Sequence, residues 1–91
     1  YGRLRLKFLK EEMKPVYTKM LMEDTLTDYL LEVDARATDM ENMLINEMKK
    51  YQNIDEKLKE EDQMKWVGAM NMIAYSAREM VLGKCINTYN I

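Results

Sequence analysis

The sequence predicts an all-α fold, and three observations support this. Three glycines and one proline in 91 residues leave room for few turns, so the elements must be few and long. Apolar side chains recur at alternating spacings of three and four, which is the period of an amphipathic helix. Apolar residues make up 47% of the chain and charged residues 33%, the balance of a globular domain. We therefore expect one helical domain over residues 1–91.

The first two predicted helices are short and meet at Pro15. The first covers residues 3–13, and its apolar face consists of Leu6, Leu9 and Met13. Pro15 ends this helix, because proline disfavours helical geometry in the residue before it and has no N–H to donate. Proline also suits the first turn of a helix, so we expect a second helix that reaches about Glu23.

Two longer amphipathic stretches follow, over 26–52 and 62–87. The first has Thr25 as its expected N-cap and carries Leu26, Leu30, Val33, Ala37, Met40 and Leu44. The second has Asp62 as its expected N-cap and carries Val67, Met70, Ala74, Ala77 and Val81, with Trp66, Ile73 and Met80 along one flank. Asn53 is the expected cap of a short connector helix between them. These seams predict a long antiparallel helical hairpin, with the two short helices packed over one end or face of it.

The apolar stripes on these two helices are wide for so small a chain. A stripe of this width is hard to cover within 91 residues, so a homodimer that completes a four-helix core is expected. Gly68 lies inside the second stripe, where glycine costs up to ~1 kcal/mol relative to alanine. Close approach of a neighbouring backbone would explain a glycine at this position.

The residue types present argue against catalysis. The chain has no histidine, which removes the usual general base near neutral pH and the commonest nitrogen ligand for metals. The single cysteine, Cys85, cannot form an internal disulfide, and a reducing cytoplasm fits this usage. The carboxylates of the third helix could hold magnesium, but a solvated outer face is the preferred explanation, because exposed charge on an amphipathic helix needs no further cause. We expect no enzyme, no catalytic residue, no cofactor and no metal.

Charge is distributed unevenly along the chain. Residues 1–22 carry six Arg and Lys against two Glu, a net charge of +4, whereas residues 23–91 carry eight against fourteen acids, a net charge of −6. The basic segment is the best candidate for binding nucleic acid, because cations neutralise phosphates. The residues expected to make this contact are Arg3, Arg5, Lys7, Lys10 and Lys14. The alternative is that this basic face pairs with the acidic remainder of the molecule.

The ten methionines suggest a second kind of binding surface. Methionine is adaptable and is frequent at surfaces that bind protein partners. Most of the ten fall on seam or flank positions, where filling the core is their ordinary role. The remaining candidates for an interface are Met20, Met22, Met43 and Met72. No apolar run approaches the ~18 residues that a membrane span needs, so we expect no membrane partner.

Four strings, in order and at characteristic spacing, resemble the TnpV family of transposon-encoded proteins. They are YGRLRLKFLKE from Tyr1, PVYTKML from Pro15, LLEVDARA from Leu30 and KWVGAMNMIAYSAREMV from Lys65. The resemblance implies a small bacterial protein carried by mobile elements, with a further segment upstream of Tyr1. It supplies no established catalytic or binding residues. Its signature positions Trp66, Gly68 and Asn71 are expected to be structural: Trp66 in packing, Gly68 in close helix contact and Asn71 in a hydrogen bond to a neighbouring backbone.

Together these observations predict a non-catalytic accessory protein of a bacterial mobile element. The leading hypothesis is that it binds DNA or a nucleoprotein complex through its basic N-terminal region. The alternative is a protein adaptor that docks on a recombinase or host protein through a Met-rich helical face. The salt dependence of DNA affinity separates the two, because only phosphate binding releases counterions.

Overall fold

The computed structural model describes residues 1–90, and these residues are helical without a strand. The elements in chain order are α1 (Gly2–Glu12), α2 (Lys14–Met22), α3 (Leu26–Tyr51), α4 (Glu56–Glu61), α5 (Gln63–Val81) and the π-helical turn η1 (Leu82–Ile86). The predicted all-α class is confirmed, together with the two short N-terminal helices and the short connector. None of these helices combines the length and the apolar composition that crossing a lipid bilayer demands.

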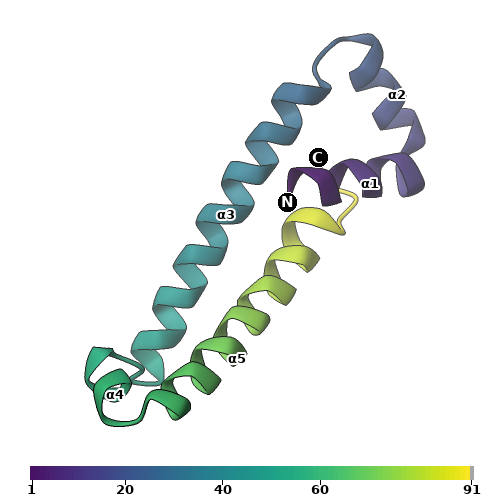
Figure 1. Ribbon diagram of the computed structural model, residues 1–91. Helices are drawn as coiled ribbons and strands as arrows, with labels where there is room; N and C mark the ends of the chain where they lie inside the picture. Colours follow the sequence, from purple (N-terminus) through teal and green to yellow (C-terminus); the bar gives the residue numbers. More distant parts are fainter. Residues whose placement is uncertain (91) are drawn as a thin grey trace.

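The molecule is elongated. Its principal extents are 56 × 19 × 17 Å, and its radius of gyration is 17.0 Å. A compact chain of this length would have a radius of gyration of about 12 Å. Figure 1 shows the cause: α3 runs most of the length of the molecule, with α1 and α2 at one end and α4 at the other.

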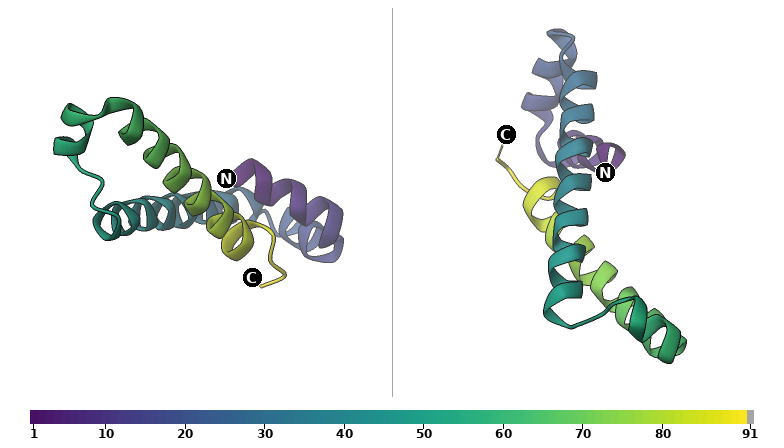
Figure 2. Two further views of the ribbon diagram at one scale, coloured as in Figure 1. Left: turned by 90° about the horizontal axis from the view of Figure 1, so that it is seen from below. Right: turned by 90° about the vertical axis from the view of Figure 1, so that its left-hand side faces the viewer.

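The two long helices, α3 and α5, run in opposite directions but do not stay in contact along their length. Figure 2 shows that they cross near the end of α5 and diverge towards α4. The most deeply buried apolar residues come from α1, α3, α5 and η1: Leu9, Val33, Ala37, Ile73, Ala77, Val81 and Ile86. The long antiparallel hairpin predicted over 26–52 and 62–87 is therefore not confirmed as a continuous pair, because the two helices separate over its α4 half.

The buried face of α5 differs from the predicted seam. Ile73, Ala77 and Val81 are almost fully buried, whereas Val67 is 41% exposed and Ala74 is also exposed. Ile73, predicted as a flanking residue, is therefore the centre of the face that meets α3. The crossing of the two helices explains why Ile73 and not Val67 meets α3, since α5 touches α3 over a short patch and not along a continuous stripe.

The chain reversals at the α4 end depend on aspartate caps. The carboxylate of Asp62 accepts a hydrogen bond from the Lys65 amide at 3.1 Å, which confirms the predicted N-cap of α5. The cap of α4 is Asp55, whose carboxylate accepts from the Leu58 amide at 2.9 Å. The prediction of Asn53 as this cap is wrong. Asn53 instead has a φ of 57°, the left-handed conformation that asparagine tolerates better than most residues.

The last helical turn is wider than an α-helix. In η1 the Asn87 amide donates to the Leu82 carbonyl at 2.7 Å, a bond that spans five residues. The wider turn places Ile86, which is 1% exposed, five residues after Val81 on the buried side. The helical pattern predicted to continue past Gly83 is thus present, but with one extra residue in its final turn.

Close backbone approach occurs at Gly2 and not at Gly68. A methyl group added at Gly2 would lie 3.4 Å from the Leu30 carbonyl oxygen, whereas one added at Gly68 would meet nothing within 4 Å. The prediction that a neighbouring backbone of this chain packs against Gly68 is therefore wrong. The start of α1 therefore lies on the α3 backbone, at a distance where an added methyl group would make an ordinary van der Waals contact.

Candidate nucleic-acid interface

Helix α1 carries the predicted basic residues at one end of the molecule, beside α2 and α3 (Figure 1). Arg3, Lys7 and Lys10 are all exposed, and their spacing of four and three places them on one face of α1. Lys14, the first residue of α2, is also exposed and follows Lys10 by four residues. The three cations on this face of α1, together with Lys14 beyond the helix break at Met13, are called here the basic stripe.

The surface along the basic stripe is a shallow groove. Arg3, Lys7 and Lys10 line it together with Leu6 and Glu11. The Lys10 ammonium lies 5.7 Å from the centre of the Tyr17 ring, so this cation also contacts α2. Three cations, one carboxylate and one leucine therefore line the groove, and its net positive charge favours an anionic ligand such as a phosphate backbone.

Arg5, the fifth predicted contact, does not belong to this surface. Its side chain is 0% exposed, so the prediction that it contacts nucleic acid is corrected. Its Nη1 donates to the carbonyl oxygens of Ile86 at 2.7 Å and Thr88 at 2.6 Å. Its Nη2 donates to the Asn90 carbonyl at 3.1 Å, and its Nε donates to the Tyr29 hydroxyl at 3.0 Å. The guanidinium thus has no free edge to offer to a phosphate.

Physical chemistry explains why a cation is stable in this buried position. The carbonyls at the end of a helix carry partial negative charge, and a guanidinium offers five donors in a rigid fork. The Phe8 ring lies 5.4 Å and the Tyr29 ring 5.9 Å from the Arg5 Cζ, which adds cation–π attraction. Arg5 therefore joins α1 to α3 and to the end of the chain after η1. These contacts are called here the Arg5 socket.

A second set of polar contacts holds the beginning of α1. The Tyr1 hydroxyl donates to the Glu41 carboxylate at 2.8 Å, and the Gly2 amide donates to Asp34 Oδ1 at 3.2 Å. Burial, together with the hydrogen bond to Glu41, raises the pKa of Tyr1 to about 12. The Arg78 guanidinium of α5 lies 5.9 Å from the Tyr1 ring. These contacts and the Arg5 socket together hold the first half of α1, and none of them uses a cation of the basic stripe.

The signature residues of α5 lie far from the basic stripe. Trp66 is half-buried, and the Lys59 ammonium lies 4.8 Å from its ring, so Trp66 packs α4 against α5 as predicted. Asn71 is exposed, and within residues 1–90 its side chain makes no hydrogen bond to a neighbouring backbone, contrary to the prediction. Gly68 is exposed as well. The signature therefore marks an outer surface of α5 as much as its core.

The remaining groups that could react or bind a metal are the Cys85 thiol and the carboxylates. The half-buried Cys85 thiol donates to the Met40 sulfur at 3.7 Å, a contact between η1 and α3. Among residues 1–90, no three Cys, Asp or Glu side chains gather where they could hold a metal ion. The carboxylates of Asp34 and Glu41 are used instead to hold α1.

The spacing of Arg5 from later apolar residues indicates that it is buried, although the count of basic residues does not distinguish it from its neighbours. Arg5 precedes the buried Leu9 by four residues and the buried Met13 by eight. A spacing of four places all three on the same face of a helix, so Arg5 sits on the buried face and not on the solvated one. Its carbonyl partners lie more than eighty residues away and have no local signature.

Comparison with known protein families finds that the family described as "Transposon-encoded protein TnpV" matches residues 1–86. This range includes all five helices and the π-helical turn. No curated protein matches the chain, and no solved structure matches it.

Proposed function

The chain belongs to the TnpV family of transposon-encoded proteins, and from this premise we propose that it is an accessory protein of a mobile element that contacts DNA through the basic stripe. The proposed role is binding and not catalysis. DNA within a nucleoprotein complex would present the same phosphates to this surface. The residues proposed to make the contact are Arg3, Lys7, Lys10 and Lys14.

The observation that carries this proposal is the arrangement of charge on α1 and at the start of α2. Four cations follow each other at spacings of four, three and four, all of them exposed. The two anchors of α1 use other residues, so phosphate binding would not compete with the contacts that hold the fold. Electrostatic attraction of this kind is independent of DNA sequence and is the main source of non-specific affinity.

The number of cations sets the expected salt dependence. Each phosphate neutralised on duplex DNA contributes about −0.9 to the slope of log affinity against log salt concentration. Four contacts therefore predict a slope of about −3.6, and each cation removed should bring it closer to zero by about one.

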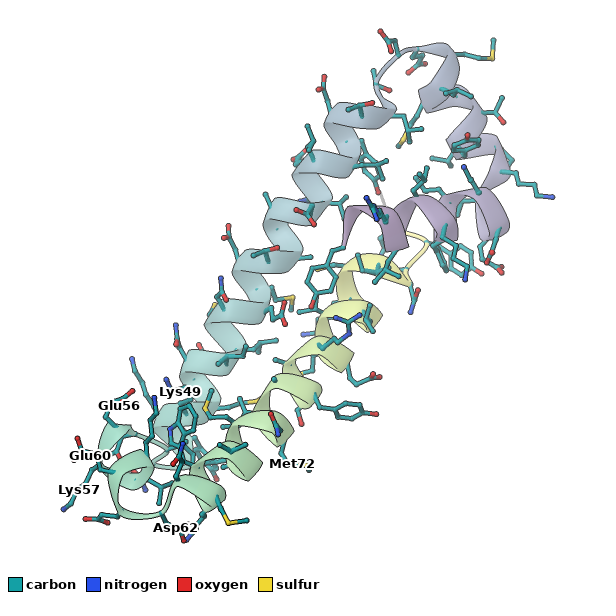
Figure 3. The ribbon with its side chains drawn as sticks, viewed as in Figure 1. Lys49, Glu56, Lys57, Glu60, Asp62 and Met72 are labelled. Carbon is teal, nitrogen blue, oxygen red and sulfur yellow. The ribbon has the colours of Figure 1, made fainter. Side chains whose placement is uncertain are left out.

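The test is fluorescence anisotropy with labelled duplex DNA across a salt series. The variant changes Arg3, Lys7 and Lys10 to alanine, and leaves Arg5 intact so that the socket is preserved. The matched control changes Lys49, Lys50 and Lys57 to alanine, which removes the same charge at the α4 end, where Figure 3 shows Lys49 and Lys57. We expect the stripe variant to lose most of its affinity and about three units of slope, whereas the control keeps nearly all of its slope.

Two results would contradict the proposal. One is absence of binding at low salt, where electrostatic attraction is strongest. The other is equal loss of affinity in the stripe variant and the control, because this would mean that total charge and not the stripe governs binding.

A second candidate, a protein adaptor for a recombinase or host protein, is favoured by a groove between α1 and α3. This groove is mainly apolar, and Leu6, Leu30 and Leu31 line it beside Arg3; Leu31 is 65% exposed. The methionines predicted for such a role do not form a single face, because they lie on different helices. Met22 ends α2, whereas Met43 lies on α3 and Met72 on α5. If the DNA test fails, this groove is the surface on which a protein partner should be sought.

A further inference from the structure

The chain exposes more surface than a compact monomer of its mass. Its accessible surface is 6710 Å². A folded monomer of this mass has about 5,600 Å², so the excess is about 1,100 Å². A standard protein–protein interface covers about 800 Å² on each partner. The excess is therefore large enough to supply one stable interface.

A further groove lies between the separated parts of α3 and α5. Met48 of α3 and Gln52, which follows α3, form one wall of this groove. The α5 wall consists of Lys65, Gly68, Ala69, Met72, Ile73 and Ser76. Except for Ile73, these residues share one flank of α5, because they recur at spacings of three and four.

Two large apolar side chains, Met72 on this flank and Tyr75 beside it, are exposed in the structure of residues 1–90. Met72 is 67% exposed and Tyr75 is 64% exposed. Figure 3 shows Met72 projecting outwards from α5. Beside them, Gly68 leaves open space, since an added methyl group would meet nothing within 4 Å. The flank therefore offers two projecting apolar side chains and a depression one helical turn away.

Charge on the same flank is arranged symmetrically about Met72. Lys65 precedes Met72 by seven residues and Glu79 follows it by seven, and both are exposed. Seven residues are two helical turns, so the two charges lie on one line, each about 10 Å from Met72 along the helix. A helix with opposite charges at equal distances from its centre is complementary to a second copy of itself that runs antiparallel.

We propose that this flank, made of Lys65, Gly68, Ala69, Met72, Ser76 and Glu79, binds a second copy of the chain. The two α5 helices lie antiparallel, and the two-fold axis passes beside Met72. In this arrangement Lys65 pairs with Glu79 of the partner subunit, and Glu79 pairs with Lys65 of the partner subunit. Tyr75 of the partner subunit covers the depression at Gly68. The contact is isologous, as expected for a closed dimer.

This proposal does not depend on DNA binding, because the α5 flank shares no residue with the basic stripe. A dimer of this form would carry two basic stripes related by the two-fold axis. A loss of DNA affinity and a loss of dimerisation are separate outcomes, so the two proposals can fail independently.

The test exchanges charges across the proposed contact and measures molar mass by light scattering on a sizing column. Wild type is expected to be a dimer at tens of micromolar concentration. Lys65→Glu and Glu79→Lys each place like charges opposite each other twice, so each should weaken the dimer about tenfold. The double variant Lys65→Glu/Glu79→Lys restores both pairs and should recover wild-type affinity. An equimolar mixture of the two single variants should also form dimers, with one chain of each kind, as native mass spectrometry can show.

The central contact is tested by Met72→Asp, with Met43→Asp as the matched control. Met43 is 52% exposed on α3, outside the proposed face. Met72→Asp should give a monomer with an unchanged circular dichroism spectrum, whereas Met43→Asp should remain a dimer. A monomeric wild type would overturn the proposal. The flank would then bind a different partner or a further segment of chain. A dimer unaffected by the charge exchanges would overturn it as well, because the subunits would then meet elsewhere.

Discussion

The two ends of the molecule are held in different ways. At the α1 end, side chains distant in sequence meet: Arg5 of α1 bonds to Tyr29 of α3 and to the backbone beyond η1. At the α4 end, the side-chain bonds are local, since Asp55 and Asp62 each bond to an amide three residues later. Figure 3 shows the charged side chains Glu56, Lys57 and Glu60 gathered around this end.

This difference indicates which end of the molecule contributes more to the free energy of unfolding. Local bonds at helix ends order one turn each, whereas the Arg5 socket joins three segments that must all be in place at once. The buried apolar residues gather mostly at the α1 end too, with Leu9 and Ile86 among the most buried. We therefore expect the α4 end to open by itself and the α1 end to unfold together with the whole chain.

The largest expected effect comes from removing the socket. Arg5→Ala loses four hydrogen bonds and leaves the buried Ile86 carbonyl without this donor, so we expect a destabilisation of about 3–5 kcal/mol. A chain of this length has a total stability of roughly 5–14 kcal/mol, so much of it would be lost. Urea unfolding followed by circular dichroism measures the change. Arg5→Lys should recover little, because one ammonium cannot replace the planar fork.

The control for the socket is a neighbouring arginine on the same helix. Arg3→Ala removes an exposed cation and should change stability by no more than about 0.5 kcal/mol. Equal destabilisation by the two variants would mean that the end of the chain is not held through Arg5.

Much of the fold could be predicted because its signals are local. Pro15 and Asp62 fix helix starts through the conformation of the residues beside them, and both lie where predicted. The apolar period also located α3 almost to its last residue. The accuracy of these predictions reflects the local physics of caps and periodicity, which needs no knowledge of the partner helix.

The errors arose where distant contacts override a local pattern. An arginine among lysines has the composition of a solvated face, and only its spacing from Leu9 places Arg5 in the interior. Where α3 and α5 cross, Ile73 meets α3 in place of the predicted Val67. A wide apolar stripe does not indicate which of its residues contact the neighbouring helix. Likewise, nothing in the Gly83 region signals that the last turn is π-helical.

An effect of intermediate size is expected at the other anchor of α1. Tyr1→Phe removes the hydrogen bond to Glu41 and should cost about 1–2 kcal/mol near neutral pH. The fold raises the pKa of Tyr1 from 10.0 to about 12, so it favours the protonated phenol. This contribution is complete below pH 10 and is lost as the pH rises from 10 to 12. The stability difference between wild type and the variant should therefore shrink over this range.

Absorbance at 295 nm tests the same group directly. One of the six tyrosines should ionise near pH 12, and this late step should be missing in Tyr1→Phe. Tyr51→Phe is the matched control, since Tyr51 is 89% exposed and its loss should leave the late step in place. A titration curve in which the late step survives in Tyr1→Phe would contradict the assignment.

The smallest effect is expected at the α4 end, where a lost cap affects one short helix. Asp55→Ala removes the bond to the Leu58 amide and should weaken α4 by about 1 kcal/mol. Because α4 is expected to open before the rest of the chain, global stability should fall by less than this local value. Amide hydrogen exchange should therefore show faster exchange in α4 with unchanged protection in α1 and at Ala77. Glu60→Ala is the control, because Glu60 is an exposed acid that does not cap α4. If this variant accelerates exchange in α4 as much as Asp55→Ala does, the charge and not the cap stabilises this helix.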